Sequence, residues 1–321
     1  MSDKTRISWT DATWNPIVGC KRVTHRCQHC YAERGAPRLV RLGLAQYDGL
    51  TRETRDGVRW TGKARWVEAV AGKPLGWRKA RRIFINAQSD IAYAGVKPRW
   101  RARIWWIIGQ CAGFLDPSRA RGHEFQILTG RPQGLLEWTE TWADPAARRA
   151  LVENLYGDGR GEVYDWMSSP KYWPDELPNL LLGVSVCDQA EADAARETWK
   201  RLKDRGWRVW VSYEPALGPV DWTGWEWLDW LVIGGESGPD ARPCERVWLA
   251  DAVAWAAQNG VPCFVKQLGD AYSDPANGVA GPRLKVDSPP PPTLRLDRAA
   301  VTDPTAWGPE LRVREFPKGR I

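Results

Sequence analysis

The sequence lacks any long hydrophobic run. None of its apolar stretches approaches the ~18 residues that a helix needs to cross the hydrocarbon core of a bilayer. The first residues, MSDKTRISWTDATWNP, also lack the apolar core of a secretory signal peptide. We therefore expect a cytoplasmic protein with no membrane partner.

Histidines and paired cysteines are scarce. The chain has 3 histidines and 7 cysteines, and a reducing compartment does not favour disulfides between such cysteines. Structural zinc sites usually take four ligands, often arranged as two pairs. A second pair is lacking, because only His123 and scattered cysteines lie outside residues 19–32. A closed structural zinc site is therefore not favoured.

Acidic residues are fewer than basic ones, which gives a net charge of +7. The excess is concentrated between Thr51 and Arg82, where three tryptophans are interleaved. The basic residues of this stretch are Arg52, Arg55, Arg59, Lys63, Arg65, Lys73, Arg78, Lys79, Arg81 and Arg82, the acidic ones Glu53, Asp56 and Glu68, and the tryptophans Trp60, Trp66 and Trp77. Cations neutralise phosphates and indole rings stack on unpaired bases. The stretch therefore indicates either nucleic-acid contact or a solvated insertion whose tryptophans pack on the body.

Strand-like apolar runs alternate with helical stretches. The strand-like runs are RIFINAQSD (82–90), EFQILTGRP (124–132), LLLGVSVCD (180–188), WRVWVSYEP (207–215), WLVIGGESG (230–238) and PCFVKQLGD (262–270). The main helical stretches are residues 99–114, 132–142, 144–157, 188–206 and 246–260. This alternation is typical of βαβ units with a parallel sheet. With one strand before Cys20, it predicts an α/β fold: a complete or partial TIM-type (β/α) barrel of about 6–7 strands, rather than a doubly wound sheet.

The composition changes near the end of the chain. We expect the barrel to occupy residues 1–270, with the basic, tryptophan-containing insertion at about 36–81. Residues 271–321 are rich in proline and glycine and contain DSPPPPTLRLD, whose four prolines favour polyproline II. This extension either wraps the body, crosses the barrel mouth or is a disordered linker.

Polar residues follow almost every predicted strand. They are Asn86, Gln88, Ser89 and Asp90; Thr129 and Arg131; Ser185 and Asp188; Glu214; Glu236 and Ser237; and Lys266 and Gln267. In a (β/α) barrel the chemistry gathers at the carboxyl ends of the strands. Structural ion pairs, such as Glu214 with Arg131 or Glu236 with Lys266, are the alternative reading.

Three cysteines stand close together in GCKRVTHRCQHCYA, residues 19–32. Cys20, Cys27 and Cys30 follow the first predicted strand, so they lie on the first loop of the predicted catalytic rim. Three thiolates on one loop suit an iron–sulfur cluster that leaves one iron without a protein ligand. Such an iron is open to a substrate or cofactor. We therefore interpret the absence of a fourth cysteine as the open coordination position that the function requires.

A cluster-binding loop after the first barrel strand resembles the radical S-adenosylmethionine superfamily. The series ISWTDATWNPIVGC…CQHCYAER…NAQSD…LTGRP…GVSV…SYEPALGP…VIGGESGPDARP…FVKQLG is also similar to a phage-associated three-cysteine family without an assigned reaction. The resemblance covers roughly residues 6–270. In the superfamily, three cysteines bind a 4Fe–4S cluster and S-adenosylmethionine chelates its fourth iron. One electron then yields a 5′-deoxyadenosyl radical. Six residues separate Cys20 from Cys27 here, where the superfamily usually has three.

The resemblance implies roles for the remaining candidates. Cys20, Cys27 and Cys30 are the implied cluster ligands. The implied cofactor-binding residues are His29 near the adenine, Asn86, Gln88, Ser89 and Asp90 near the methionine amino group, and Ser185 and Glu214 near the ribose or the methionine carboxylate. Glu236, Lys266 and Arg131 lie further round the rim, where the substrate is expected.

The phage relationship and the basic insertion together favour a nucleic-acid or nucleotide substrate. Our leading hypothesis is a radical enzyme that rearranges or functionalises a nucleobase substituent in phage DNA. One alternative is a DNA-lesion repair lyase resembling spore photoproduct lyase. Another is a non-catalytic nucleic-acid-binding protein that holds a cluster or a metal. The enzyme reading implies a host electron donor of flavodoxin or ferredoxin type, and the host cytoplasm as its location if a phage encodes it.

Overall fold

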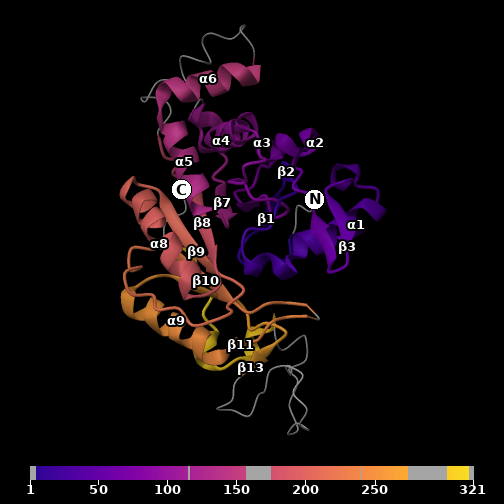
Figure 1. The fold of residues 1–321 in the computed structure, drawn as a ribbon. Helices are drawn as coiled ribbons and strands as arrows, with labels where there is room; N and C mark the ends of the chain where they lie inside the picture. Colours follow the sequence, from indigo (N-terminus) through magenta and orange to yellow (C-terminus); the bar gives the residue numbers. More distant parts are fainter. Residues whose placement is uncertain (1–4, 115, 157–174, 239, 274–301, 318–321) are drawn as a thin grey trace. The chain divides into compact units, whose positions relative to one another are not determined.

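Parallel strands in consecutive order form the main sheet (Figure 1). The computed structural model describes residues 5–114, 116–156, 175–238, 240–273 and 302–317. The strands of the sheet, in hydrogen-bonded order, are β1 (Ala12–Trp14), β6 (Arg82–Ile85), β7 (Glu124–Thr129), β8 (Leu180–Val186), β9 (Arg208–Tyr213), β10 (Trp230–Gly234) and β12 (Cys263–Gln267). The pairs β1–β6, β6–β7, β9–β10 and β10–β12 are parallel. All seven strands match the positions predicted from the sequence.

The strand order decides between the two α/β architectures. A doubly wound sheet reverses its strand order at a switch point, whereas here the spatial order follows the sequence from β1 to β12. This is the connectivity of a partial (β/α) barrel. In the described part of the chain, β1 and β12 stand at the two ends of the hydrogen-bonded series. The partial barrel, and not the complete one, is therefore what the strand pairing supports.

The chain divides into two compact units. The first comprises Met1–Gly183, Arg201–Arg208 and Gly319–Ile321, and the second comprises Val184–Lys200 and Val209–Lys318. None of the helices in the described part of the chain is long and apolar enough to cross a membrane.

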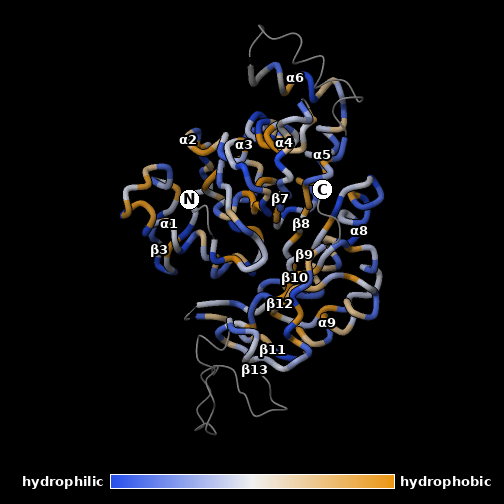
Figure 2. The backbone as a smooth tube through the Cα atoms, turned by 180° about the vertical axis from the view of Figure 1, so that it is seen from behind, coloured by the Kyte–Doolittle hydropathy of each residue, from blue (hydrophilic) through white to orange (hydrophobic). Residues whose placement is uncertain are grey.

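Helices that follow β6 and β7 cover the sheet of the first unit. They are α4 (Pro98–Ala112), α5 (Pro132–Ala143) and α6 (Pro145–Tyr156). Each begins with proline, whose fixed φ suits the first helical turn and whose missing N–H costs nothing there. Helix α4 shows hydrophobic and hydrophilic residues alternating in Figure 2, and it buries Ile104, Trp105 and Ile108. Trp105 packs edge-to-face on Trp138 of α5, with ring centroids 5.6 Å apart.

The two helices predicted in the second half of the sequence are confirmed. Helix α8 (Gln189–Asp204) is capped by Asp188, whose Oδ1 accepts the backbone N–H of Glu191 at 3.0 Å. It ends just before Gly206, as predicted. Helix α9 (Arg246–Asn259) ends at Gly260, which has the left-handed conformation that favours glycine.

The basic insertion folds around a small core of its own. It contains α1 (Tyr31–Arg41), η2 (Ala45–Tyr47), β3 (Thr51–Thr54), β4 (Gly57–Trp60), β5 (Arg65–Trp66), α2 (Glu68–Ala71) and α3 (Lys73–Gly76). Strand β5 pairs with β2 (Ile17–Val18), and β3 forms an antiparallel hairpin with β4. Val18, Ala36, Leu50 and Trp60 are buried together in its core.

The tryptophans of the insertion pack on the protein. Trp60 is 8% exposed. Trp66 stacks on Trp100 with centroids 6.3 Å apart, and Trp77 meets the edge of His123 at 6.1 Å. The interpretation that these rings pack on the body therefore describes them better than an open stacking platform does.

Part of the C-terminal extension completes the sheet edge of the second unit. Residues after η5 (Pro304–Ala306) and η6 (Pro309–Leu311) run antiparallel to β12. Val265 donates to the carbonyl of Val313 at 2.9 Å, and Glu315 donates to the carbonyl of Cys263 at 2.8 Å. The extension thus wraps the body here and covers an exposed strand edge. A short pair, β11 (Cys244–Glu245) with β13 (Tyr272–Ser273), precedes it. The proline run at 287–297 lies outside the described residues.

Candidate metal-cluster site

The cysteine loop is attached to the end of β6 in the first unit. Gly19 donates to the carbonyl of Gln88 at 3.0 Å, and Ser89 Oγ donates to the carbonyl of Gly19 at 2.7 Å. Gly19 has φ +90°, and a side chain there would collide with the carbonyl of Lys63. Glycine is therefore required immediately before Cys20. These bonds place the first cysteine beside the polar residues that follow β6.

The other two cysteines lie on a short 3-10 turn, η1 (His25–His29), and at its exit. Cys27 donates to the carbonyl of Thr24 at 3.1 Å, and Cys30 donates to the carbonyl of Cys27 at 3.3 Å. Cys30 is also the N-cap residue of α1. Burial raises the pKa of the Cys30 thiol, and the backbone N–H groups of Glu33 and Ala32 act against that rise. All three cysteines are free and half-buried.

An arginine–carboxylate pair joins β6 and β7 to the first cysteine. Arg131 Nη1 lies 2.6 Å from Asp90 Oδ2 and 3.8 Å from Cys20 Sγ. Its Nη2 donates to the carbonyl of Lys21. The guanidinium also lies 4.9 Å from the ring centroid of Tyr93. Arg131 is thus fixed on four sides, with one N–H group aimed at a cysteine sulfur.

Asp90 is the centre of this arrangement. Its Oδ1 accepts hydrogen bonds from Thr129 Oγ1 at 2.7 Å and from the N–H of Ala92 at 2.9 Å. Its Oδ2 accepts from the N–H of Gly130 at 3.0 Å and from Arg131. Both carboxylate oxygens are fully used. The expectation that Asp90 accepts a cofactor ammonium therefore does not fit its surroundings, and its evident role is to position Arg131.

The charge state of Cys20 reflects the same surroundings. Burial raises the pKa of its thiol to about 12, with a further rise from Asp90, and Arg131 opposes both.

Three buried amide atoms next to the loop have no hydrogen-bond partner in the described part of the chain. They are Asn15 Oδ1, Asn86 Nδ2 and Gln88 Oε1. Asn15 follows β1 and Asn86 follows β6, and the preceding residues Trp14 and Ile85 are paired in the sheet. Asn86 has φ +59° and is 3% exposed; its Oδ1 accepts the N–H of Ile17 at 3.2 Å. Because a buried polar group without a partner costs about 1–3 kcal/mol, these three atoms are candidates for contact with a ligand.

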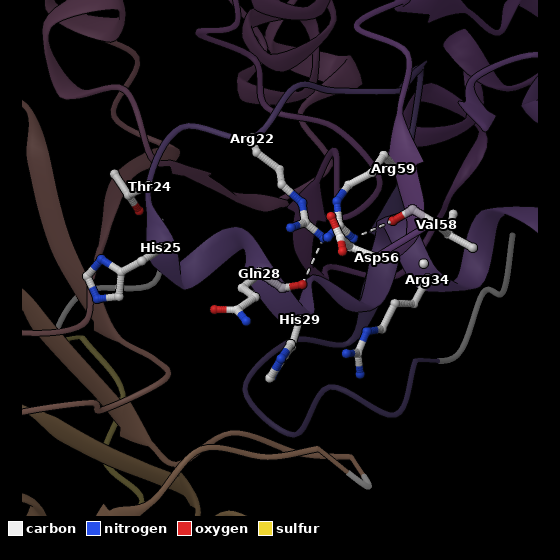
Figure 3. Close-up of a pocket in the computed structure, with 10 residues that line it drawn as sticks. Arg22, Thr24, His25, Gln28, His29, Arg34, Asp56, Val58 and Arg59 are labelled. Atoms are coloured by element: carbon white, nitrogen blue, oxygen red, sulfur yellow. Dashed lines mark hydrogen bonds between the residues drawn. The ribbon is translucent and has the colours of Figure 1, made fainter. Parts of the chain in front are cut away.

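His29 and Tyr31 flank the third cysteine. His29 lines a pocket between the cysteine loop and the β3–β4 hairpin (Figure 3). The Tyr31 hydroxyl donates to the carbonyl of Ala87 at 2.6 Å, which gives the loop a second attachment to the end of β6. The predicted contact of His29 with an adenine ring stays a prediction.

The candidates in the second unit form two separate groups. Lys266 Nζ lies 2.8 Å from Glu214 Oε1, and Ser212 Oγ donates to Glu214 Oε2 at 3.1 Å. Glu236 is instead held by Arg242, whose Nη2 and Nε lie 2.7 and 2.9 Å from its two oxygens. The predicted ion pairs of Glu214 with Arg131 and of Glu236 with Lys266 are therefore wrong in their partners. Glu236 has little capacity left for catalysis.

The glycines before Glu236 have a packing role. A side chain on Gly235 would lie 2.9 Å from Gly269 Cα and would collide with the carbonyl of Leu268. The two backbones after β10 and β12 therefore approach one another too closely for any other residue. Gln267 bridges the same turn, since its Nε2 donates to the carbonyl of Gly235 at 2.9 Å and to Ser237 Oγ. Ser185 is half-buried at the end of β8.

A buried ion pair behind the cysteine loop is missing from the sequence-based candidates. Glu33 is fully buried, and its Oε2 accepts from Arg22 Nε at 2.7 Å and from Arg22 Nη2. Its Oε1 accepts the backbone N–H of Trp60 at 2.7 Å. Glu33 thereby joins the loop, α1 and the hairpin. The sequence signal at Glu33 is an acidic residue in the first turn of a helix, which indicates a favourable interaction with the helix dipole but not a buried ion pair.

A family model matches residues 4–310, and its description is "Protein of unknown function (DUF5131)". The chain belongs to this family. The match includes the cysteine loop, the seven strands of the main sheet and the C-terminal extension as far as residue 310. Comparison with curated proteins and with solved structures found no match. The function is therefore inferred from the site itself.

We expect Asp90→Asn to loosen the site. The amide nitrogen replaces an acceptor that faces two donors, so at least one charge-assisted hydrogen bond is lost, at about 1.5–3 kcal/mol of unfolding free energy. Urea unfolding measures this loss. Asp56→Asn is the matched control: Asp56 is exposed in the hairpin turn, and its replacement is expected to change stability by less than about 0.5 kcal/mol. Equal effects of the two substitutions would show that Asp90 does not organise the site.

Proposed function

We propose that this protein is a radical S-adenosylmethionine enzyme that rearranges or functionalises a nucleobase substituent in phage DNA. One observation carries the proposal: a loop with three free cysteines is attached, through Gly19, to the end of β6, where three buried amide atoms have no hydrogen-bond partner among the described residues. The first feature supports a cluster and the second supports a small polar cofactor beside it.

Cys20, Cys27 and Cys30 are the residues that would hold a 4Fe–4S cluster. Three thiols and no fourth cysteine on the loop match a cluster with one iron left for another ligand. When bound, such a cluster supplies the single electron that cleaves S-adenosylmethionine. The separate attachments of the loop at Gly19 and Tyr31 hold its two ends against the strand ends before any cofactor arrives.

The unpartnered amides complement the amino-acid portion of S-adenosylmethionine. Asn15 Oδ1 and Gln88 Oε1 are acceptors for its ammonium group, and Asn86 Nδ2 is a donor for its carboxylate. Asp90 is less suitable, because both of its oxygens already accept two hydrogen bonds each. Ser89 Oγ donates to the carbonyl of Gly19 and keeps its acceptor lone pairs. Among the residues after β6, the cofactor role therefore falls to Asn86 and Gln88, with Ser89 as a further acceptor.

Arg131 contributes charge rather than proton transfer. Its guanidinium donates toward Cys20 Sγ, and hydrogen bonds to cysteine sulfurs are among the features that set the potential of iron–sulfur centres. Its positive charge also favours the thiolate form of Cys20. Held by Asp90, it acts on the ligand sulfur from a fixed position. Arg131 is thus better described as tuning the site than as contacting substrate.

The nature of the substrate follows from the basic insertion. Its cations lie between Thr51 and Arg82, and part of that stretch forms the hairpin beside the cysteine loop. Cations next to a redox site favour a substrate that carries phosphates. A nucleobase in DNA, or a nucleotide precursor of it, meets this condition.

Nucleoside analysis tests the proposal. The anaerobically reconstituted protein is incubated with reductant, S-adenosylmethionine and DNA that contains hydroxymethylpyrimidines. The DNA is then digested to nucleosides, whose masses are measured by mass spectrometry. We expect a new nucleoside that requires both reductant and S-adenosylmethionine. Turnover of ultraviolet-irradiated DNA alone would establish the repair lyase instead. Unchanged nucleosides from both DNAs would contradict a reaction on the DNA base.

A further inference from the structure

A polar pocket of about 570 Å³ adjoins the cysteine loop in the first unit. The loop supplies Arg22, Thr24, His25, Gln28 and His29, helix α1 supplies Arg34, and the hairpin supplies Asp56, Gly57, Val58 and Arg59 (Figure 3). Its volume is within the range of small-molecule sites, about 300–1,000 Å³. Among the proposed cluster and cofactor residues, His29 lines this pocket.

The described walls of the pocket carry an excess of positive charge. They include three arginines and two histidines, and one carboxylate, that of Asp56. The charge of Arg22 is balanced by Glu33 behind the wall, but its Nη2 also donates to the carbonyl of Gln28 at 2.8 Å, which fixes the guanidinium at the rim. In Figure 3 the guanidinium groups of Arg22 and Arg59 point toward the same part of the pocket, beside Asp56.

Arg59 forms no salt bridge among the described residues, although Asp56 also lines the pocket. It is half-buried, and its only hydrogen bond in the described part of the chain is to the carbonyl of Val58 at 3.1 Å. On the neighbouring strand, Arg52 stands directly opposite Arg59 in the register of the hairpin. Like charges directly opposite on a β-ladder are destabilising. Arg52 is exposed and does not line the pocket, so Arg59 is the cation that the hairpin presents to a ligand there.

Planar guanidinium groups present N–H donors that recognise phosphate oxygens. Arg22 and Arg59 bring two such groups to the walls of this pocket. Thr24 also lines the pocket, but Figure 3 shows it beside His25 and away from these two groups, and its Oγ1 is buried.

We propose that this pocket binds a phosphate group of the substrate, with Arg59 as its principal ligand and with Arg22 as a further donor. The inference rests on the proposed function, since it locates the phosphate of the same nucleotide substrate. The pocket includes Gln28 and His29, the two residues between Cys27 and Cys30. Phosphate binding there holds the attached nucleoside next to the cysteine loop.

Direct binding measurements on the full-length, reconstituted protein without reductant or S-adenosylmethionine test this site. The probes are deoxythymidine 5′-monophosphate, deoxythymidine without phosphate, and a short single-stranded oligodeoxynucleotide. We expect Arg59→Ala to weaken binding of a phosphate-bearing probe about tenfold or more, the loss of one charge-assisted hydrogen bond. Arg41→Ala, the same change at the exposed end of α1, is expected to change it by less than about twofold.

The probes also separate the two sources of phosphate. Tight binding of the monophosphate supports the site and identifies a free nucleotide; binding of the oligonucleotide alone supports it and identifies a DNA strand. Equal binding of thymidine and its monophosphate together with no binding of the oligonucleotide, or equal losses in Arg59→Ala and Arg41→Ala, would overturn the inference. Because no step of the assay uses S-adenosylmethionine, this result is independent of the cleavage chemistry. Intact cleavage without phosphate binding contradicts this inference alone, and phosphate binding without cleavage contradicts the proposed function alone.

Discussion

Cys27→Ala is expected to abolish cluster binding while leaving the protein folded. Cys27 is half-buried on η1, so its loss creates little cavity. Removing only a residue that hydrogen-bonds to a metal ligand already lowers metal affinity about 10–100-fold. Removing one of three thiolate ligands should cost more. After anaerobic reconstitution, iron and acid-labile sulfide per chain should fall to near background, with an unchanged circular dichroism spectrum.

The matched control is Cys111→Ala. Cys111 is 1% exposed in α4 and is not part of the loop, so this variant should take up as much iron and sulfide as the wild-type protein. Normal cluster content in Cys27→Ala would show that Cys27 is not a ligand of the cluster. Zinc without sulfide in the wild-type protein would favour a metal-containing binding protein instead.

Glu33→Ala is expected to destabilise the first unit by about 1–3 kcal/mol, the cost of leaving a buried polar group without its partner, because the Arg22 side chain is 24% exposed and can be hydrated. The substitution leaves Arg22 without its carboxylate and the N–H of Trp60 without its acceptor. Both groups are needed to hold the loop and the hairpin against α1. Urea unfolding of the cluster-free protein measures the change directly.

Two further variants make the Glu33 result specific. Glu33→Gln keeps an acceptor for Trp60 and loses the charge that faces Arg22, so its effect should be smaller than that of Glu33→Ala. Glu53→Ala removes an exposed glutamate from the same hairpin and should cost less than about 0.5 kcal/mol. Similar unfolding midpoints for Glu33→Ala and Glu53→Ala would show that the buried pair does not stabilise the fold.

The order of strands and helices can be predicted from this sequence because each element carries a local signal. Buried strands such as Leu180–Val186 read as continuous apolar runs. Asp188 and Gly206 bracket α8 through capping and a positive φ, both of which are local properties. The strand order then follows from the rule that connections are short and right-handed.

The partners of charged side chains could not be predicted in the same way. Sequence separation gives no indication that Arg131 meets Asp90, 41 positions away, or that Glu236 is held by Arg242 rather than by Lys266. Which charged side chains meet depends on where each strand ends relative to its neighbours along the strand direction. The interleaved tryptophans were equally ambiguous, because an indole that stacks on a base and one that packs in a small core share the same sequence signal. Trp60 belongs to the core.

The most direct test of the central claim is the detection of 5′-deoxyadenosine. The protein is reconstituted anaerobically with iron and sulfide, reduced, and incubated with S-adenosylmethionine. The account predicts that 5′-deoxyadenosine is formed by the wild-type protein and is not formed when Cys20, Cys27 or Cys30 is replaced by alanine. A folded, reduced protein that holds its cluster and forms no 5′-deoxyadenosine would contradict it.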